Sequence, residues 1–94
     1  MNKLEHLLVC LSEECAEVIK AVNKALRFGL KDGYPNGTTT NKQDIENELE
    51  HLTAITFMLV DEGVCFKLNP KSRIEKMRQV KRYMEYARER GRIR

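Results

Sequence analysis

The fold is decided by residues 4–28, which read LEHLLVCLSEECAEVIKAVNKALRF. Apolar residues recur here at intervals of three and four, the spacing that places side chains on one face of an α-helix. The main apolar line consists of Leu4, Leu7, Leu8, Leu11, Cys15, Val18 and Val22. Asn2 can cap the first turn, and Gly29 is a typical residue just past a helix end. The stretch therefore predicts one long amphipathic helix that ends near Phe28.

A second long helix is predicted over residues 42–62. Thr40 and Gln43 form a capping-box pair at its start, and Gly63 suits its C-terminal end. Residues 30–41 are rich in Gly, Asn, Asp and Thr, a composition that is typical of a loop. This loop has room for one short additional helix.

A third helix is predicted over residues 73–90, between a capping-box pair at Ser72 and Glu75 and a stop at Gly91. No stretch alternates polar and apolar residues for long enough to predict a strand. At 94 residues the chain has the length of one domain. We therefore expect a single all-α domain over residues 1–94, a bundle of three long helices with room for a short fourth.

Size and composition limit where the protein works and how it completes its core. A 94-residue domain buries only part of its surface, and no disulfide framework compensates. Cys10, Cys15 and Cys65 are odd in number and lack CxxC spacing, which favours a reducing compartment. The longest apolar stretch, near residues 54–60, is far shorter than the ~20 residues of a membrane-spanning helix, and no secretory leader is recognisable. We expect a cytoplasmic homodimer or homotetramer with no membrane partner.

Charge is distributed unevenly along the chain, although the net charge is only +3. Residues 67–94, which we call the basic tail, contain eleven Lys and Arg against three Glu. Residues 1–66 contain six basic and eleven acidic residues. This division suits a site that holds a metal ion and a phosphate, and it also suits a nucleic-acid-binding tail. The basic residues are spread around the predicted third helix, so nucleic acid is not the expected partner.

One acidic residue lies where the second predicted helix should be apolar. At ~100° per residue, Glu48 falls inside the line of Ile45, Leu49, Leu52, Thr56 and Leu59, and His51 lies at its margin. A carboxylate that faces a core is costly unless it is paired or binds a metal ion. Glu14 and Glu17 form a similar pair on the first helix, so the two pairs could enclose Mg²⁺ or Mn²⁺. The alternative is a solvated acidic face that includes Glu13 and pairs with Lys20, Lys24 and Lys42.

The acidic residues also belong to an ordered set of motifs. Residues 11–18 read LSEECAEV, which contains EExxE, and residues 48–51 read ELEH. Residues 59–64 read LVDEGV, and residues 75–76 read EK. In order and spacing, this set resembles the EExxE, ExxD, ADELG and EK motifs of the MazG-like superfamily of all-α nucleoside triphosphate pyrophosphohydrolases. The resemblance extends over roughly residues 7–86.

The resemblance implies hydrolysis of a ribo- or deoxyribonucleoside triphosphate between its α and β phosphates, giving a monophosphate and pyrophosphate. The implied metal ligands are Glu14, Glu17, Glu48 and His51. Mg²⁺ would bridge these ligands and the anionic substrate, with Mn²⁺ as the alternative ion.

Other residues take further tasks under this resemblance. Glu13 would position or deprotonate the attacking water, and Lys76 would contact phosphate oxygens. Lys24 and Arg27 lie beyond the acidic line on the first helix and are further candidates for phosphate binding. The candidates for stacking on the base are Phe28 and Tyr34.

His51 departs from the resemblance, because the family has Asp at that position. Imidazole is a poorer ligand for Mg²⁺ than carboxylate and suits Mn²⁺ or a softer ion better. Three interpretations follow: His51 binds the ion with an altered metal preference, the ion has three protein ligands plus water, or the site has lost catalysis. The last interpretation predicts a non-catalytic nucleotide-binding or interaction module of the same fold.

Overall fold

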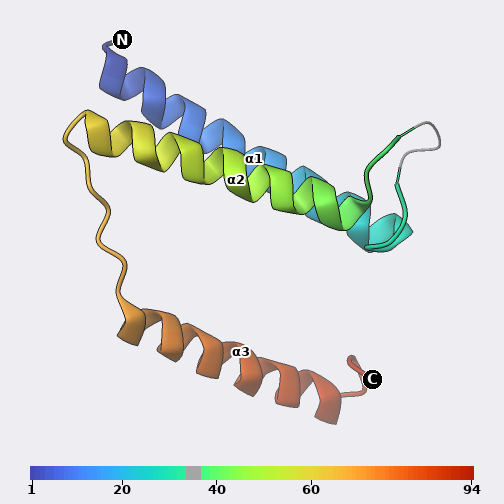
Figure 1. The fold of residues 1–94 in the computed structure, drawn as a ribbon. Helices are drawn as coiled ribbons and strands as arrows, with labels where there is room; N and C mark the ends of the chain where they lie inside the picture. The colour runs from blue at the N-terminus through green and yellow to red at the C-terminus, as the bar shows by residue number, and fades with distance from the viewer. Residues whose placement is uncertain (34–36) are drawn as a thin grey trace.

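The computed structural model describes residues 1–33 and 37–94, which form three α-helices and no strand (Figure 1). The helices are α1 at Lys3–Phe28, α2 at Asn41–Asp61 and α3 at Pro70–Glu89. The predicted all-α class is therefore confirmed. No extra helix forms in the described part of the loop between α1 and α2, and Tyr34 lies outside the described residues. None of the described helices is long and apolar enough to cross a membrane.

Local hydrogen bonds fix the starts of α1 and α2 where the sequence predicts them. Asn2 Oδ1 accepts a hydrogen bond from the Glu5 amide at 2.8 Å and satisfies a donor in the first turn of α1. Thr40 Oγ1 accepts from the Gln43 amide at 3.2 Å, and Gln43 Oε1 accepts from the Thr40 amide at 2.8 Å. This reciprocal pair is the predicted capping box of α2.

The predicted start of α3 at residue 73 is wrong. The helix begins at Pro70 and is capped by Asn69, whose Oδ1 accepts from the amides of Lys71 at 3.0 Å and Ser72 at 3.3 Å. Proline suits the first helical position, because the N–H it lacks would have no partner within the helix and its fixed φ already matches a helix. Ser72 is therefore inside the first turn and does not cap the helix.

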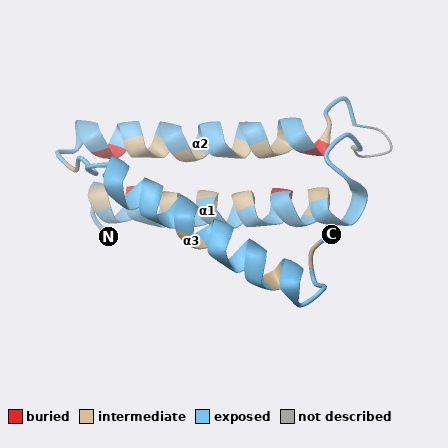
Figure 2. Ribbon diagram, turned by 90° about the horizontal axis from the view of Figure 1, so that it is seen from below, coloured by how far each residue is buried: buried red, intermediate tan, exposed pale blue. Residues whose placement is uncertain are grey.

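α1 and α2 pack side by side as an antiparallel helical hairpin (Figure 1 and Figure 2). Among the described residues, the buried apolar side chains are Leu7 and Ala21 of α1 and Leu59 of α2. At the open end of the hairpin, Lys3 Nζ lies 2.7 Å from Glu62 Oε1. The hydrogen bond to Glu62 and the charge of that carboxylate raise the pKa of Lys3 above its ordinary value. This pair is exposed to solvent, so it adds little to the stability of the hairpin.

In the described ranges, α3 packs against neither α1 nor α2, and Figure 1 shows it apart from the hairpin at the end of an extended connector. The radius of gyration is 17.1 Å, whereas a compact domain of this length has about 12 Å. Large apolar side chains remain exposed on all three helices, among them Ile19, Leu26, Phe57, Met77 and Tyr83. The three helices therefore do not close into the predicted bundle within the described part of the chain.

Candidate metal centre

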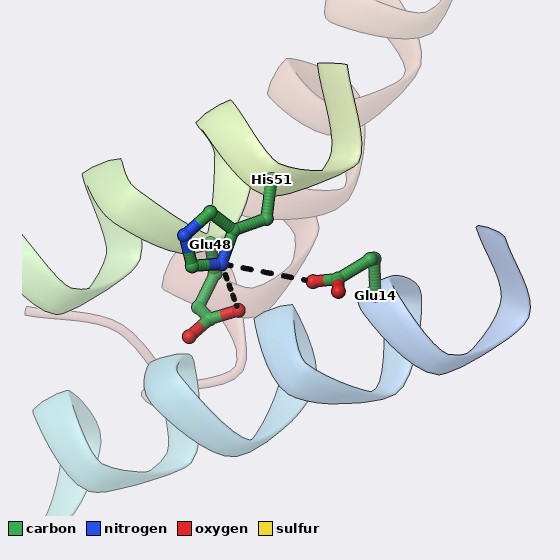
Figure 3. A group of neighbouring side chains, drawn as sticks. All are labelled: Glu14, Glu48 and His51. Atoms are coloured by element: carbon green, nitrogen blue, oxygen red, sulfur yellow. Dashed lines mark ion pairs between the residues drawn. The ribbon is translucent and has the colours of Figure 1, made fainter. Parts of the chain in front are cut away.

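Three ligand-type side chains from facing helices meet in the hairpin (Figure 3). Glu14 comes from α1, and Glu48 and His51 come from neighbouring turns of α2. His51 Nδ1 lies 3.4 Å from Glu48 Oε2 and 3.9 Å from Glu14 Oε2. One ligand atom from each residue lies within 4.8 Å of the other two. The three residues thus form a compact cluster of two carboxylates and one imidazole.

The surroundings of this cluster favour a cation. The Glu14 and Glu48 side chains are only 26% and 22% exposed, whereas the His51 side chain is 59% exposed. Glu14 Oε2 is buried and has no hydrogen-bond donor among the described residues. A buried carboxylate oxygen without a donor is costly, and two carboxylates this close repel each other. A divalent ion between the carboxylates would reduce both penalties.

A cavity of about 210 Å³, which we call the acidic cavity, opens beside the cluster. It is lined by Glu17, Lys20, Ala21, Lys24, Asp44, Asn47, Glu48 and His51. Glu17 therefore borders the same space as Glu48 and His51, although its side chain is exposed and does not belong to the three-residue cluster. The predicted ligands Glu14, Glu48 and His51 come together, and Glu17 lies on the adjoining wall.

Asp44 is a carboxylate of the acidic cavity that sequence reasoning does not single out. It lies one helical turn before Glu48, so the two carboxylates share a face of α2. Asp44 Oδ1 accepts a hydrogen bond from Thr39 Oγ1 at 2.8 Å. The i, i+4 spacing of Asp44 and Glu48 is the sequence signal that could have found it.

A second cavity of about 650 Å³, which we call the basic cavity, lies towards the loop that joins α1 to α2. Its lining residues are Lys20, Asn23, Lys24, Arg27, Phe28, Asp32, Gly33 and Asn41. Lys20 and Lys24 line both cavities, so the two cavities are neighbours. Of the two residues predicted to bind phosphate, Lys24 lines the acidic cavity together with Glu17 and Glu48, whereas Arg27 lines only the basic cavity. Such an arrangement suits a polyphosphate that also binds a metal ion.

Two predicted site residues are not brought to either cavity in the described structure. Glu13 is exposed on α1 and lines neither cavity. Lys76 lies on α3, away from the hairpin, and its Nζ donates to Gln79 Oε1 at 3.1 Å. The structure therefore brings neither residue to the cluster of Glu14, Glu48 and His51.

No protein-family model, no curated protein and no solved structure matches the chain. The resemblance to pyrophosphohydrolases therefore rests on the motifs quoted above. Independently of the motifs, the structure brings Glu14, Glu48 and His51 together.

Proposed function

We propose that this chain is a metal-dependent nucleoside triphosphate pyrophosphohydrolase, which cleaves ribo- or deoxyribonucleoside triphosphates between the α and β phosphates. The observation that carries the proposal is the cluster of Glu14, Glu48 and His51 on facing helices. Its members follow the order of the MazG-like motifs along the chain. Lys20 and Lys24, which line the adjoining cavities, provide the positive charge that an anionic substrate requires.

The donor set fits a divalent cation. Carboxylates suit Mg²⁺ and Mn²⁺ alike, and the imidazole of His51 shifts the preference towards Mn²⁺. Glu14 Oε2, buried and without a hydrogen-bond donor in the described ranges, is the atom that gains most from such an ion. Glu14, Glu48 and His51 would hold the ion, and Glu17 on the wall of the acidic cavity is the proposed fourth ligand.

The residues of the site have separate tasks in the proposed reaction. A bound divalent ion supplies charge neutralisation to the phosphates and makes bound water more acidic. Lys20 and Lys24 contact phosphate oxygens and stabilise the negative charge that develops on the leaving pyrophosphate. The resemblance alone assigns to Glu13 the task of accepting the proton of the attacking water, and in the described structure Glu13 lines neither cavity.

The test of this function is pyrophosphate release from a panel of ribo- and deoxyribonucleoside triphosphates, with Mg²⁺ and Mn²⁺ in parallel. Release should require metal, stop on chelation and be faster with Mn²⁺, because imidazole is the softer ligand. If a folded chain that still binds nucleotide releases no pyrophosphate from any substrate of the panel, the result favours the alternative function. That alternative is a non-catalytic nucleotide-binding or interaction module, which the departure at His51 motivates.

Replacing His51 with Asp should raise the ratio of the Mg²⁺-supported rate to the Mn²⁺-supported rate about tenfold. The reason is that the substitution restores a hard oxygen ligand at the position where the family has Asp. The matched control is His6→Asp, since His6 is exposed in the first turns of α1 and far along the helix from Glu14. An unchanged ratio would remove His51 from the ligands. Activity gained from a silent parent would identify the parent as the non-catalytic module.

A second copy of the chain is the proposed partner of the exposed apolar surfaces. The chain exposes 8135 Å², whereas a compact monomer of 11.0 kDa exposes about 5,600 Å². The excess of about 2,500 Å² is several times the roughly 800 Å² that each partner buries in a standard interface. The basic tail and the acidic hairpin also attract each other between copies. In such an assembly α3 of one copy would bring Lys76 to the hairpin of the other.

Sedimentation should therefore show a dimer or tetramer, and Met84→Glu should dissociate it, because Met84 shares one face of α3 with the exposed apolar residues Met77 and Val80. Arg82→Gln is the matched control, since it changes the net charge by the same amount on the opposite face of α3. A parent that sediments as an 11.0 kDa monomer while its circular dichroism remains helical would contradict the proposed assembly. Equal dissociation by both variants would point to charge rather than apolar packing.

A further inference from the structure

The closed end of the hairpin holds a cavity that the proposed reaction uses only in part. The basic cavity has a volume of about 650 Å³, within the range of about 300–1,000 Å³ for small-molecule sites. It shares Lys20 and Lys24 with the acidic cavity, whereas Arg27 and Asp32 line only the basic one. From Glu17 to Arg27 α1 rises about 15 Å, a length comparable to an extended nucleoside triphosphate. Phosphates over the shared lysines would therefore place the nucleoside in the basic cavity.

The rim of the basic cavity is held by contacts between the loop after α1 and the start of α2. The Asn41 amide donates to the Asp32 carbonyl oxygen at 2.6 Å, and Asn41 Nδ2 donates to the Gly29 carbonyl oxygen at 2.8 Å. The Asn41 residue is only 3% exposed. Gly33 passes so close to the Thr39 carbonyl that a Cβ atom at position 33 would overlap that oxygen. These contacts fix the position of Asp32 relative to both helices.

The basic cavity offers a flat cation and a hydrogen-bond acceptor. The Arg27 guanidinium lies over the Phe28 ring, 5.2 Å from its centroid, and such a planar group stacks well on nucleic-acid bases. Asp32 Oδ1 accepts from the Gly33 amide at 2.8 Å, and the carboxylate retains further lone pairs for a ligand. An ionised carboxylate accepts hydrogen bonds but donates none, so it distinguishes heterocycles by the N–H donors that they present.

We infer that the basic cavity binds the base of the nucleotide and that Asp32 selects guanine, an inference that rests on the proposed function. Guanine presents two adjacent donors, N1–H and the N2 amino group, and one carboxylate can accept from both. Adenine and cytosine present one amino donor beside a ring-nitrogen acceptor, which repels the carboxylate. Uracil and thymine present a single N–H between two carbonyl acceptors.

Binding of nucleoside monophosphates tests this inference, because they contain the base but have no α–β bond to cleave. GMP, IMP, AMP, CMP and UMP are titrated calorimetrically into the full chain in the presence of Mn²⁺. GMP should bind most tightly, and IMP, which lacks only the N2 amino group, about tenfold more weakly. In Asp32→Asn the affinity for GMP should fall about tenfold and its difference from IMP should disappear. Asp61→Asn, a matched loss of a carboxylate at the far end of α2, should change neither.

The outcomes separate this inference from the proposed function. Guanine selection by Asp32 is overturned if the chain binds all five monophosphates equally, or if its preference for GMP survives Asp32→Asn. Metal-dependent pyrophosphate release by the same chain would still support the proposed hydrolase. Selective GMP binding that Asp32→Asn removes, in a chain that releases no pyrophosphate, supports the assignment of the cavity and overturns the hydrolase. The comparison of GMP with IMP in the unmutated chain decides the matter if Asp32→Asn fails to fold.

Discussion

Replacing Glu48 with Gln is expected to abolish metal-dependent pyrophosphate release and to weaken Mn²⁺ binding about 100-fold or more. Gln keeps the size of the side chain but offers a neutral amide oxygen where a charged carboxylate would bind the ion. The Glu48 side chain is only 22% exposed, so water has little access to replace the lost carboxylate ligand. The measurements are the rate of pyrophosphate release and, independently, the free Mn²⁺ signal in electron paramagnetic resonance.

The matched control is Glu50→Gln. Glu50 lies on the same helix but is exposed and faces away from Glu48, so both measurements should match those of the unmutated chain. Unweakened Mn²⁺ binding in Glu48→Gln would remove Glu48 from the ligand set. Equal losses in the two variants would assign the effect to the net charge of α2 rather than to the cluster.

Replacing Leu59 with Ala is expected to lower the free energy of unfolding by about 2–5 kcal/mol. Leu59 is 0% exposed, and it is the only large side chain among the described residues that is fully buried. Truncation leaves a cavity between the two helices. Few neighbouring side chains are available to move into this cavity. The measurement is urea unfolding followed by circular dichroism at one fixed protein concentration, because the proposed assembly would make stability depend on concentration.

Leu68→Ala is the control for this loss of stability. Leu68 lies in the connector and is 82% exposed, so its truncation should change the free energy of unfolding by no more than about 0.5 kcal/mol. A Leu59→Ala variant that unfolds at the same urea concentration as the unmutated chain would show that the hairpin is not stabilised mainly at Leu59.

Helix positions are predictable here to the extent that short-range contacts decide them. The capping box at Thr40 lies within one turn of α2, and sequence spacing alone reveals it. At the start of α3 two caps compete, Asn69 and Ser72, and the earlier one is used because Pro70 fits the first helical position. Choosing between them requires weighing the proline, which the capping-box pattern ignores.

The same distinction between short-range and long-range contacts decides which parts of the candidate site can be predicted from the sequence. The predicted apolar lines account only in part for the approach of Glu14 to Glu48 and His51. They are wrong at Leu8, Cys15 and Val22 of α1 and at Leu49 of α2, which are exposed. The buried residues of α1 are Leu7 and Ala21. The position of Lys76 does not follow from the sequence, since the connector before α3 has no periodic pattern that sets a direction. The position of Asp32 is equally unpredictable from the sequence. A hydrogen bond from the Asn41 amide across the loop positions it, and no periodic pattern in the sequence indicates that contact.

Under the proposed assembly, the isolation of α3 within one chain would make the order of this helix depend on the protein concentration. A solitary helix of 20 residues is only marginally stable in water. Under the proposed assembly, docking of α3 obeys mass action, so dilution would release and loosen the basic tail while the hairpin stays folded. Lys76 would then move away from the hairpin of the partner copy. The capacity to hold a polyphosphate would rise and fall with the abundance of the chain, as a property of the population rather than of a single molecule.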